Sequence, residues 1–181
     1  MLSCTASLNQ KTNVMKKALL ITILFIGFLG ANAQSDFKFG VGPNIGIPIG
    51  DAGDISSLTI GVEVQGELKF SDKASGIVTT GYTHFIGKDY FGVKLSYGAI
   101  PILIGGRVYP SEQFFIGGQI GYGFFTGDAS SGGFAYKPQV GYNTSSVQLG
   151  LSYNGISNNG SISWIALSAI FSFGGSGTAS K

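Results

Sequence analysis

Apolar and polar residues alternate along most of the chain beyond Gln34. The clearest case is the segment 58–70, where apolar residues fill nearly every even position and Thr, Gly, Glu, Gln or Lys fills every odd one. The side chains of a β-strand point alternately to opposite faces, so this period of two predicts a strand with one apolar and one polar face. The same pattern predicts further strands in the segments 37–49, 114–124, 134–143, 147–154 and 164–173.

Two more strands are predicted from less regular patterns. The segment 77–86 fits either register, because apolar residues occupy both faces. In the segment 93–104, the apolar residues up to Tyr97 are out of phase with those from Ile100 onward, so we expect a bulge near Gly98-Ala99. Proline lacks the N–H that a β-ladder needs, so we expect local irregularity at four of the prolines. These are Pro43, Pro48, Pro101 and Pro138.

The connections between the eight predicted strands alternate in length. Three are tight, at 71–75, 110–113 and 143–146. The other four are longer on average and rich in Gly, Asp, Asn and Ser, at 51–57, 87–92, 126–133 and 155–161. Short turns on one side and longer loops on the other are typical of a transmembrane β-barrel, with the longer loops outside the cell. We therefore expect an all-β, eight-stranded antiparallel up-and-down barrel with both ends on the periplasmic side.

The low charge of the chain indicates that the apolar face meets lipid. Only 11% of the residues are charged, whereas a soluble globular domain has roughly 25%. The polar register consists mainly of Gly, Ser, Thr, Gln and Asn, which suits an enclosed lumen better than a wall in water. Aromatic residues also gather near both ends of the apolar face, as in the girdles of membrane barrels. They are Phe37, Phe70, Phe114, Tyr142 and Phe173 at one end, and Phe124, Phe134, Tyr136 and Tyr153 at the other.

The first 33 residues have the pattern of a signal peptide that is cleaved after Ala33. Lys16 and Lys17 precede an apolar run, which is shorter than the ~20 residues of a spanning helix and ends in Ala31-Asn32-Ala33. Met15 is a candidate for the true start. From Gln34 onward there are 8 basic and 9 acidic residues, so charge gives no support for nucleic-acid binding.

Three segments carry a resemblance to a known family. They are Ile100–Tyr109 (IPILIGGRVY), Phe115–Phe124 (FIGGQIGYGF) and Lys137–Tyr142 (KPQVGY). The region 34–173 resembles the outer-membrane β-barrel domain family of OmpA/OmpX-type, porin-like proteins. The resemblance implies a location in the outer membrane of a Gram-negative bacterium, among phospholipid and lipopolysaccharide. It also implies that Phe171 and Phe173 form the terminal signal read by the barrel-assembly machinery, although a tail at 174–181, which we expect to be disordered, follows them.

The predicted lumen contains six charged residues. An eight-stranded barrel is just wide enough for side chains to fill it, and buried charges must be paired. We expect an ion-pair cluster of Glu67, Lys38 and Arg107 at the periplasmic end, with Glu63 higher and facing Lys137. The lumen set is Lys38, Glu63, Glu67, Lys69, Arg107 and Lys137. Its structural interpretation is an internal plug, and its functional alternative is a narrow ion path or gate.

No reaction centre is evident in the sequence. Cys4 lies in the leader, and His84 is the only histidine, with no acidic residue beside it in register. We therefore predict a non-enzymatic barrel with a structural or surface-interaction role, without cofactor or metal. The alternatives are a narrow ion or small-solute channel, a lipid-modifying barrel enzyme in which His84 acts, and a soluble periplasmic barrel that binds an apolar ligand. The extracellular partner and the oligomeric state are left open.

Overall fold

A computed structural model describes residues 37–90, 93–94, 96–126, 132–144, 146–158 and 160–174 of the chain. The predicted leader and most of the predicted tail lie outside the described residues. Eight long strands are found: β1 (Phe37–Ile49), β2 (Ser56–Ser71), β3 (Ala74–Gly87), β6 (Tyr97–Val108), β7 (Phe114–Thr126), β8 (Gly132–Asn143), β9 (Val147–Ser157) and β10 (Ser161–Gly174). The shorter elements are α2 (Asp51–Ile55), β4 (Asp89–Tyr90) and β5 (Val93–Lys94). None of the helices among these residues is long and apolar enough to cross a membrane.

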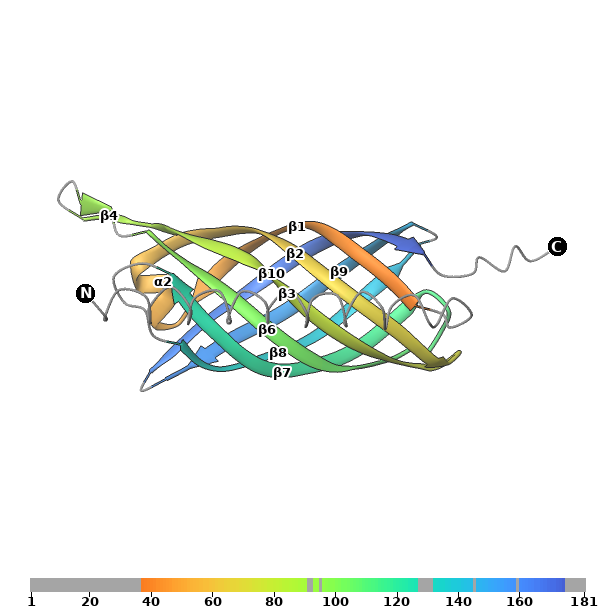
Figure 1. Cartoon of the computed structure of the whole chain (residues 1–181). Coiled ribbons are helices and arrows are strands. Elements are labelled where there is room, and N and C mark those ends of the chain that lie inside the picture. The colour runs from red at the N-terminus through yellow and green to blue at the C-terminus, as the bar shows by residue number, and fades with distance from the viewer. Residues whose placement is uncertain are drawn as a thin grey trace, which may run out of the picture. The chain divides into compact units, whose positions relative to one another are not determined.

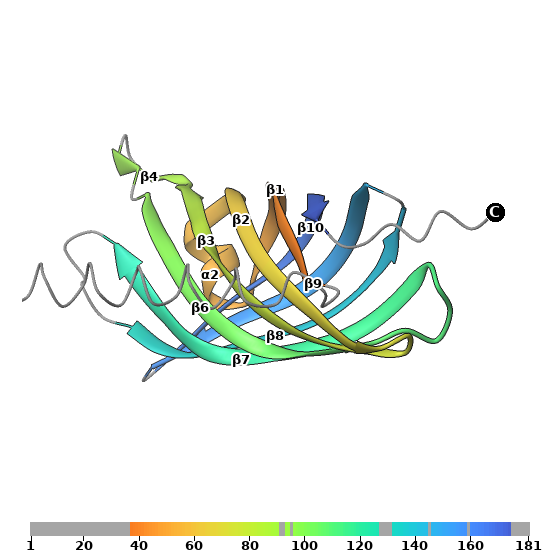
Figure 2. The same ribbon diagram turned by 45° about the vertical axis from the view of Figure 1, so that its right-hand side comes forward.

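The eight long strands close into one antiparallel barrel (Figures 1 and 2). Each strand pairs with its neighbours in the order β1, β2, β3, β6, β7, β8, β9, β10, and β10 then pairs with β1. The closing contact between the first and last strands runs from Lys38–Gly174 to Ile49–Ser163. The predicted fold class, an eight-stranded antiparallel up-and-down barrel, is confirmed.

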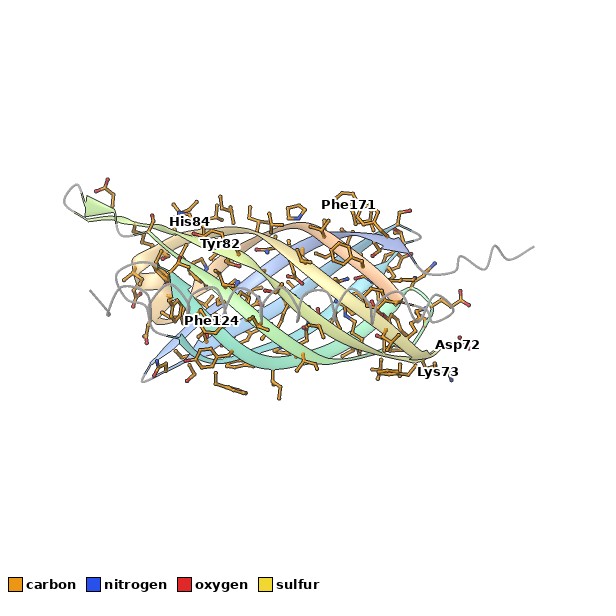
Figure 3. All side chains as sticks on the ribbon, in the orientation of Figure 1. Asp72, Lys73, Tyr82, His84, Phe124 and Phe171 are labelled. Carbon is orange, nitrogen blue, oxygen red and sulfur yellow. The ribbon has the colours of Figure 1, made fainter. Side chains whose placement is uncertain are left out.

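The barrel wall is apolar outside and largely polar inside. Ile120 is 57% exposed on the outer surface, whereas its neighbour Gln119 is 2% exposed in the lumen. Val62 and Glu63 show the same contrast, at 52% and 8%. In Figure 3, Phe171 projects outward from the wall. A soluble barrel has the opposite arrangement, so the outer surface of this one is suited to the hydrocarbon of a bilayer.

The two ends of the barrel differ as the predicted connections do. β2 and β3 are joined by a two-residue turn at Asp72-Lys73, which lies at the end of the barrel opposite to His84 (Figure 3). The other end carries the helix α2 and the small hairpin β4–β5, neither of which was predicted. The predicted loop at 155–161 is mostly strand, because Ser157 pairs with Ser161. Gly155 is a strand residue covered by the ring of Tyr136, which leaves no room for a Cβ.

The predicted bulge at Gly98-Ala99 was wrong. β6 pairs with β3 and β7 in one continuous register from Tyr97 to Val108. Tyr97, Ala99 and Leu103 all face the lumen, while Ile100 and its alternate neighbours face outward. The change of phase arises because Tyr97 packs in the lumen while Ile100 faces outward, and Val93 belongs to the separate hairpin β4–β5, so no bulge is needed. Leu95 lies outside the described residues.

Three of the four prolines coincide with interruptions of a ladder, as their missing N–H predicts. The pairing of β1 with β10 is interrupted at Pro43, that of β3 with β6 at Pro101, and that of β8 with β9 at Pro138. The register is the same on both sides of each interruption. Pro48 is paired with Trp164.

Candidate functional site: the filled lumen

Arg107 is the centre of the polar network in the half of the lumen that ends at the Asp72-Lys73 turn. The short turns at this end are the ones predicted to face the periplasm, so we call it the periplasmic end and the opposite one the outer end. It projects inward from β6 and is 3% exposed. Its Nη1 donates to Glu67 Oε2 at 3.1 Å and to Gln148 Oε1 at 3.0 Å. Its Nη2 donates to Gln65 Oε1 at 3.0 Å and to Gln139 Oε1 at 3.2 Å. One guanidinium therefore links side chains from β2, β6, β8 and β9 across the barrel.

Glu67 is the carboxylate that neutralises Arg107. Its Oε2 also accepts a hydrogen bond from Gln148 Nε2 at 3.2 Å, and its Oε1 accepts one from the hydroxyl of Tyr109. The guanidinium carbon of Arg107 lies 4.3 Å from the ring centroid of Phe115, which adds a cation–π contact. A buried charge is tolerated only when it is paired and hydrogen-bonded, and both partners of this pair meet that condition.

A second ion pair lies farther from the periplasmic end. Lys137 Nζ is 2.6 Å from Glu63 Oε1, and both residues are buried. Beside them is a cavity of about 20 Å³, whose lining includes Asn44, Thr79 and Asn154. A cavity of this size holds about one water molecule. Among the described residues, the middle of the lumen is thus polar, and this cavity is closely lined by side chains.

An apolar cluster fills the lumen near the outer end. The ring centroids of Phe85 and Tyr97 are 4.6 Å apart and stacked, and Trp164 meets Phe85 edge-on at 5.1 Å. We call this cluster the apolar plug. Its buried members are Phe85, Ala99, Leu103, Ala135, Ile156, Trp164 and Ala166, and Tyr97, Phe125 and Ile162 pack against them.

The structure brings four of the six predicted lumen charges together in two pairs, Glu67 with Arg107 and Glu63 with Lys137. Lys38 lies opposite Glu67 in register but makes no ion pair within the described residues. Lys69 also makes none there, and its Nζ lies 5.5 Å from the ring centroid of Tyr109. The predicted cluster of three is therefore a pair, because Arg107, Tyr109 and Gln148 already occupy the carboxylate.

Sequence reasoning missed the roles of four uncharged lumen residues. Gln65, Gln139 and Gln148 were recognised as lumen-facing, but their common attachment to Arg107 was not. Tyr109 lies just beyond the end of β6, where the period of two no longer indicates a direction. The number of donors on Arg107 could have indicated these further partners, because a buried guanidinium has five N–H groups and one carboxylate cannot accept hydrogen bonds from all of them.

Phe171 and Phe173, the predicted assembly signal, lie on the outer surface of β10. They are 48% and 58% exposed. This position lets them contact another molecule, and their role as a signal stays a prediction.

His84 lies on the outer surface near the outer end of β3. Its Nδ1 is 3.4 Å from the hydroxyl of Tyr82, and the two rings are stacked at a centroid distance of 6.3 Å. Among the described residues no group of three His, Cys, Asp or Glu side chains is placed to hold a metal ion.

Substituting His84→Gln is expected to change the free energy of unfolding by less than about 0.5 kcal/mol, as for an ordinary surface site. Equilibrium unfolding measures this change, and a loss several times larger would show that His84 has a structural role.

Comparison with known proteins places this geometry among a group of small barrels. No family model matches the chain, and no curated protein matches it. Among solved structures, it is similar to Ail, the attachment invasion locus protein of Yersinia pestis, crystallised with the heparin analogue sucrose octasulfate. The TM-score is 0.58 at 13% identity, over 77% of this chain and 99% of Ail. This chain has the fold of the small outer-membrane barrels.

Two further structures support the same fold. The backbone structure of Ail in a phospholipid bilayer nanodisc matches with a TM-score of 0.57 at 15% identity, over 77% of this chain and all of Ail. Neisserial surface protein A matches with a TM-score of 0.52 at 16% identity, over 76% of this chain and 96% of that protein. In this fold the lumen is the place where a pore would lie. Here two ion pairs and the apolar plug occupy it.

Proposed function

We propose that this chain is a non-enzymatic, integral outer-membrane barrel with a structural or surface-interaction role. The observation that carries the proposal is the filled lumen. The Arg107 network links four strands in the periplasmic half, and the apolar plug closes the outer half. The apolar outer surface contacts membrane lipid, with lipopolysaccharide around its outer end. A role at the cell surface is supported by the likeness to Ail, an attachment invasion locus protein, and to Neisserial surface protein A.

The outer end of the barrel is the part available to an extracellular partner. It carries α2 and the hairpin β4–β5, and these two elements are joined through Lys88. The backbone N–H of Lys88 donates to Ile55 O at 2.8 Å, and its Nζ donates to Gly53 O at 2.5 Å. α2 is thereby held against the end of β3, and its Ala52 is fully buried.

The charge of the outer connections favours a partner other than a sulfated sugar. The connecting segments contain four acidic residues, Asp51, Asp54, Asp89 and Asp128, and two basic ones, Lys88 and Lys94. Ail was crystallised with a sulfated heparin analogue, and a polyanion requires a basic surface. We expect the purified chain in zwitterionic detergent to pass through a heparin column at physiological salt. Retention that is lost when Lys88 and Lys94 are both changed to Gln would contradict this part of the proposal, because the outer connections would then bind the sulfated sugar.

The closed lumen predicts that the protein does not conduct ions. Purified protein reconstituted into a planar bilayer is expected to give no steady channels, because an ion would have to cross the apolar plug and the Arg107 network. The control is Glu67→Gln, which leaves the plug in place and is expected to stay silent too. Steady channels in the wild-type protein would support the alternative of a narrow channel. If Glu67→Gln then altered them, the conducting path would pass the Arg107 network.

A further inference from the structure

Lys38 and Lys69 leave the periplasmic end of the lumen with an excess of positive charge. Lys38 projects from β1 and Lys69 from β2, both in the lumen register and both half-buried. Neither makes an ion pair within the described residues. A half-buried ammonium group without a carboxylate is less well solvated than one on an open surface.

Glu67 is not available to form an ion pair with either of these lysines. The two carboxylate oxygens of Glu67 accept hydrogen bonds from Arg107, Tyr109 and Gln148. The positive charge of Arg107 already neutralises the single negative charge of this carboxylate. Within the described residues, Glu67 is the only carboxylate in the lumen register of the periplasmic half. Lys38 and Lys69 therefore add two positive charges that nothing in the described lumen balances.

The two lysines are close enough to act on one ligand. Lys38 is the register partner of Glu67, and Lys69 lies two residues farther along the same strand. A diagonal pair of this kind on one face of a sheet is about 7–8 Å apart, with its Cβ atoms somewhat closer. The contact of Lys69 Nζ with the ring of Tyr109 holds one ammonium group on the lumen side of the barrel end. A cleft with low-dielectric walls and charges of one sign concentrates counter-ions.

We propose that Lys38 and Lys69 form a binding site for a phosphate group at the periplasmic mouth of the barrel. A free phosphate or a phosphate monoester carries a charge of about −1.5 to −2 and has three oxygens that can accept hydrogen bonds, which matches the two unbalanced ammonium groups. The phosphodiester of a phospholipid headgroup carries a single negative charge, and each of its two non-bridging oxygens can accept a hydrogen bond from one of the lysines. Lysine binds phosphate as a compact point charge and needs no fixed fork geometry. The phosphate comes either from a soluble phosphate compound or from the headgroup of a phospholipid. The name of this end as periplasmic rests on the proposed function.

The test is a titration of the folded protein with inorganic phosphate in zwitterionic micelles, followed by the amide NMR signals of residues 38 and 69. We expect saturable shifts, and an affinity about tenfold lower in each of Lys38→Gln and Lys69→Gln. The matched control is Lys73→Gln, which removes the same charge from an exposed turn at the same end of the barrel. It is expected to leave the affinity unchanged. Equal weakening by Lys73→Gln would overturn the proposal, because the attraction would then be diffuse.

To distinguish a soluble phosphate compound from a lipid headgroup, the same amide NMR signals are measured in nanodiscs of phosphatidylglycerol and in nanodiscs of phosphatidylcholine. If the ligand is a headgroup, the amide NMR signals of residues 38 and 69 in the wild-type protein are expected to differ between phosphatidylglycerol and phosphatidylcholine nanodiscs. This difference is expected to be absent in the double variant that combines Lys38→Gln with Lys69→Gln. A soluble ligand predicts shifts with inorganic phosphate in either lipid. The absence of any response to phosphate or phosphatidylglycerol would overturn the site. The circular dichroism of each variant reports folding separately, so failure of the site is distinguishable from failure of the barrel assignment.

Discussion

Replacing Glu67 by alanine is expected to lower the free energy of unfolding by about 3–5 kcal/mol, the usual cost of removing one partner of a buried ion pair. The loss is large because Arg107 would remain in the lumen at 3% exposure with only glutamine oxygens to accept its hydrogen bonds. Tyr109 and Gln148 would also each lose an acceptor. Equilibrium urea unfolding of the protein in lipid vesicles measures the change.

The matched control is Glu112→Ala. Glu112 is an exposed carboxylate in the turn between β6 and β7, at the same end of the barrel. Its removal is expected to change the free energy of unfolding by less than about 0.5 kcal/mol. If the two variants lost similar amounts, the Arg107 network would not be a main source of stability in the lumen.

Placing an arginine at position 120 is expected to cost about 2–4 kcal/mol of unfolding free energy, the known penalty at the midplane of a membrane barrel. Ile120 lies at the centre of β7 and is 57% exposed. In a water-soluble protein, a charge at so exposed a site has almost no effect on stability. The penalty arises here because the exposed surface contacts hydrocarbon, which cannot solvate a guanidinium group.

The depth dependence of this penalty supplies the control. Val108 is 54% exposed on the same outer surface, but it ends β6 at the periplasmic boundary. Val108→Arg is expected to cost only about 0–1 kcal/mol, since the guanidinium there reaches water and headgroups. Equal costs at positions 108 and 120, measured in the same vesicles, would contradict the placement of the bilayer.

The sequence predicted most of the barrel because a membrane wall repeats one simple rule. Along β7, apolar residues such as Ile120 alternate with lumen residues such as Gln119, and every such strand indicates its own register. The same reasoning also predicted the partners of the two salt bridges. Glu67 and Arg107 both face inward near the periplasmic end, and a low-dielectric lumen forces opposite charges together.

The register of β3 and β6 was not predictable, and the apolar plug is the reason. Phe85 and Tyr97 face the lumen, so apolar residues lie on both faces of these strands near the outer end. The period of two then disappears from the sequence even though the strand continues. α2 escaped prediction for a different reason. Its sequence, Asp51-Ala-Gly-Asp-Ile55, has the composition of a loop, and contacts with β1, β2 and β10 accompany its helical form.

The central claim is that polar and plug residues lie inside the barrel while the apolar face meets lipid, and the single tryptophan of the chain tests it directly. Trp164 is 3% exposed within the apolar plug. In vesicles of lipids brominated on their acyl chains, its fluorescence is expected to be only weakly quenched. A variant that combines Trp164→Phe with Ile120→Trp is expected to be strongly quenched. Strong quenching of Trp164 together with no quenching at position 120 would show that the wall is inverted, and would contradict the account.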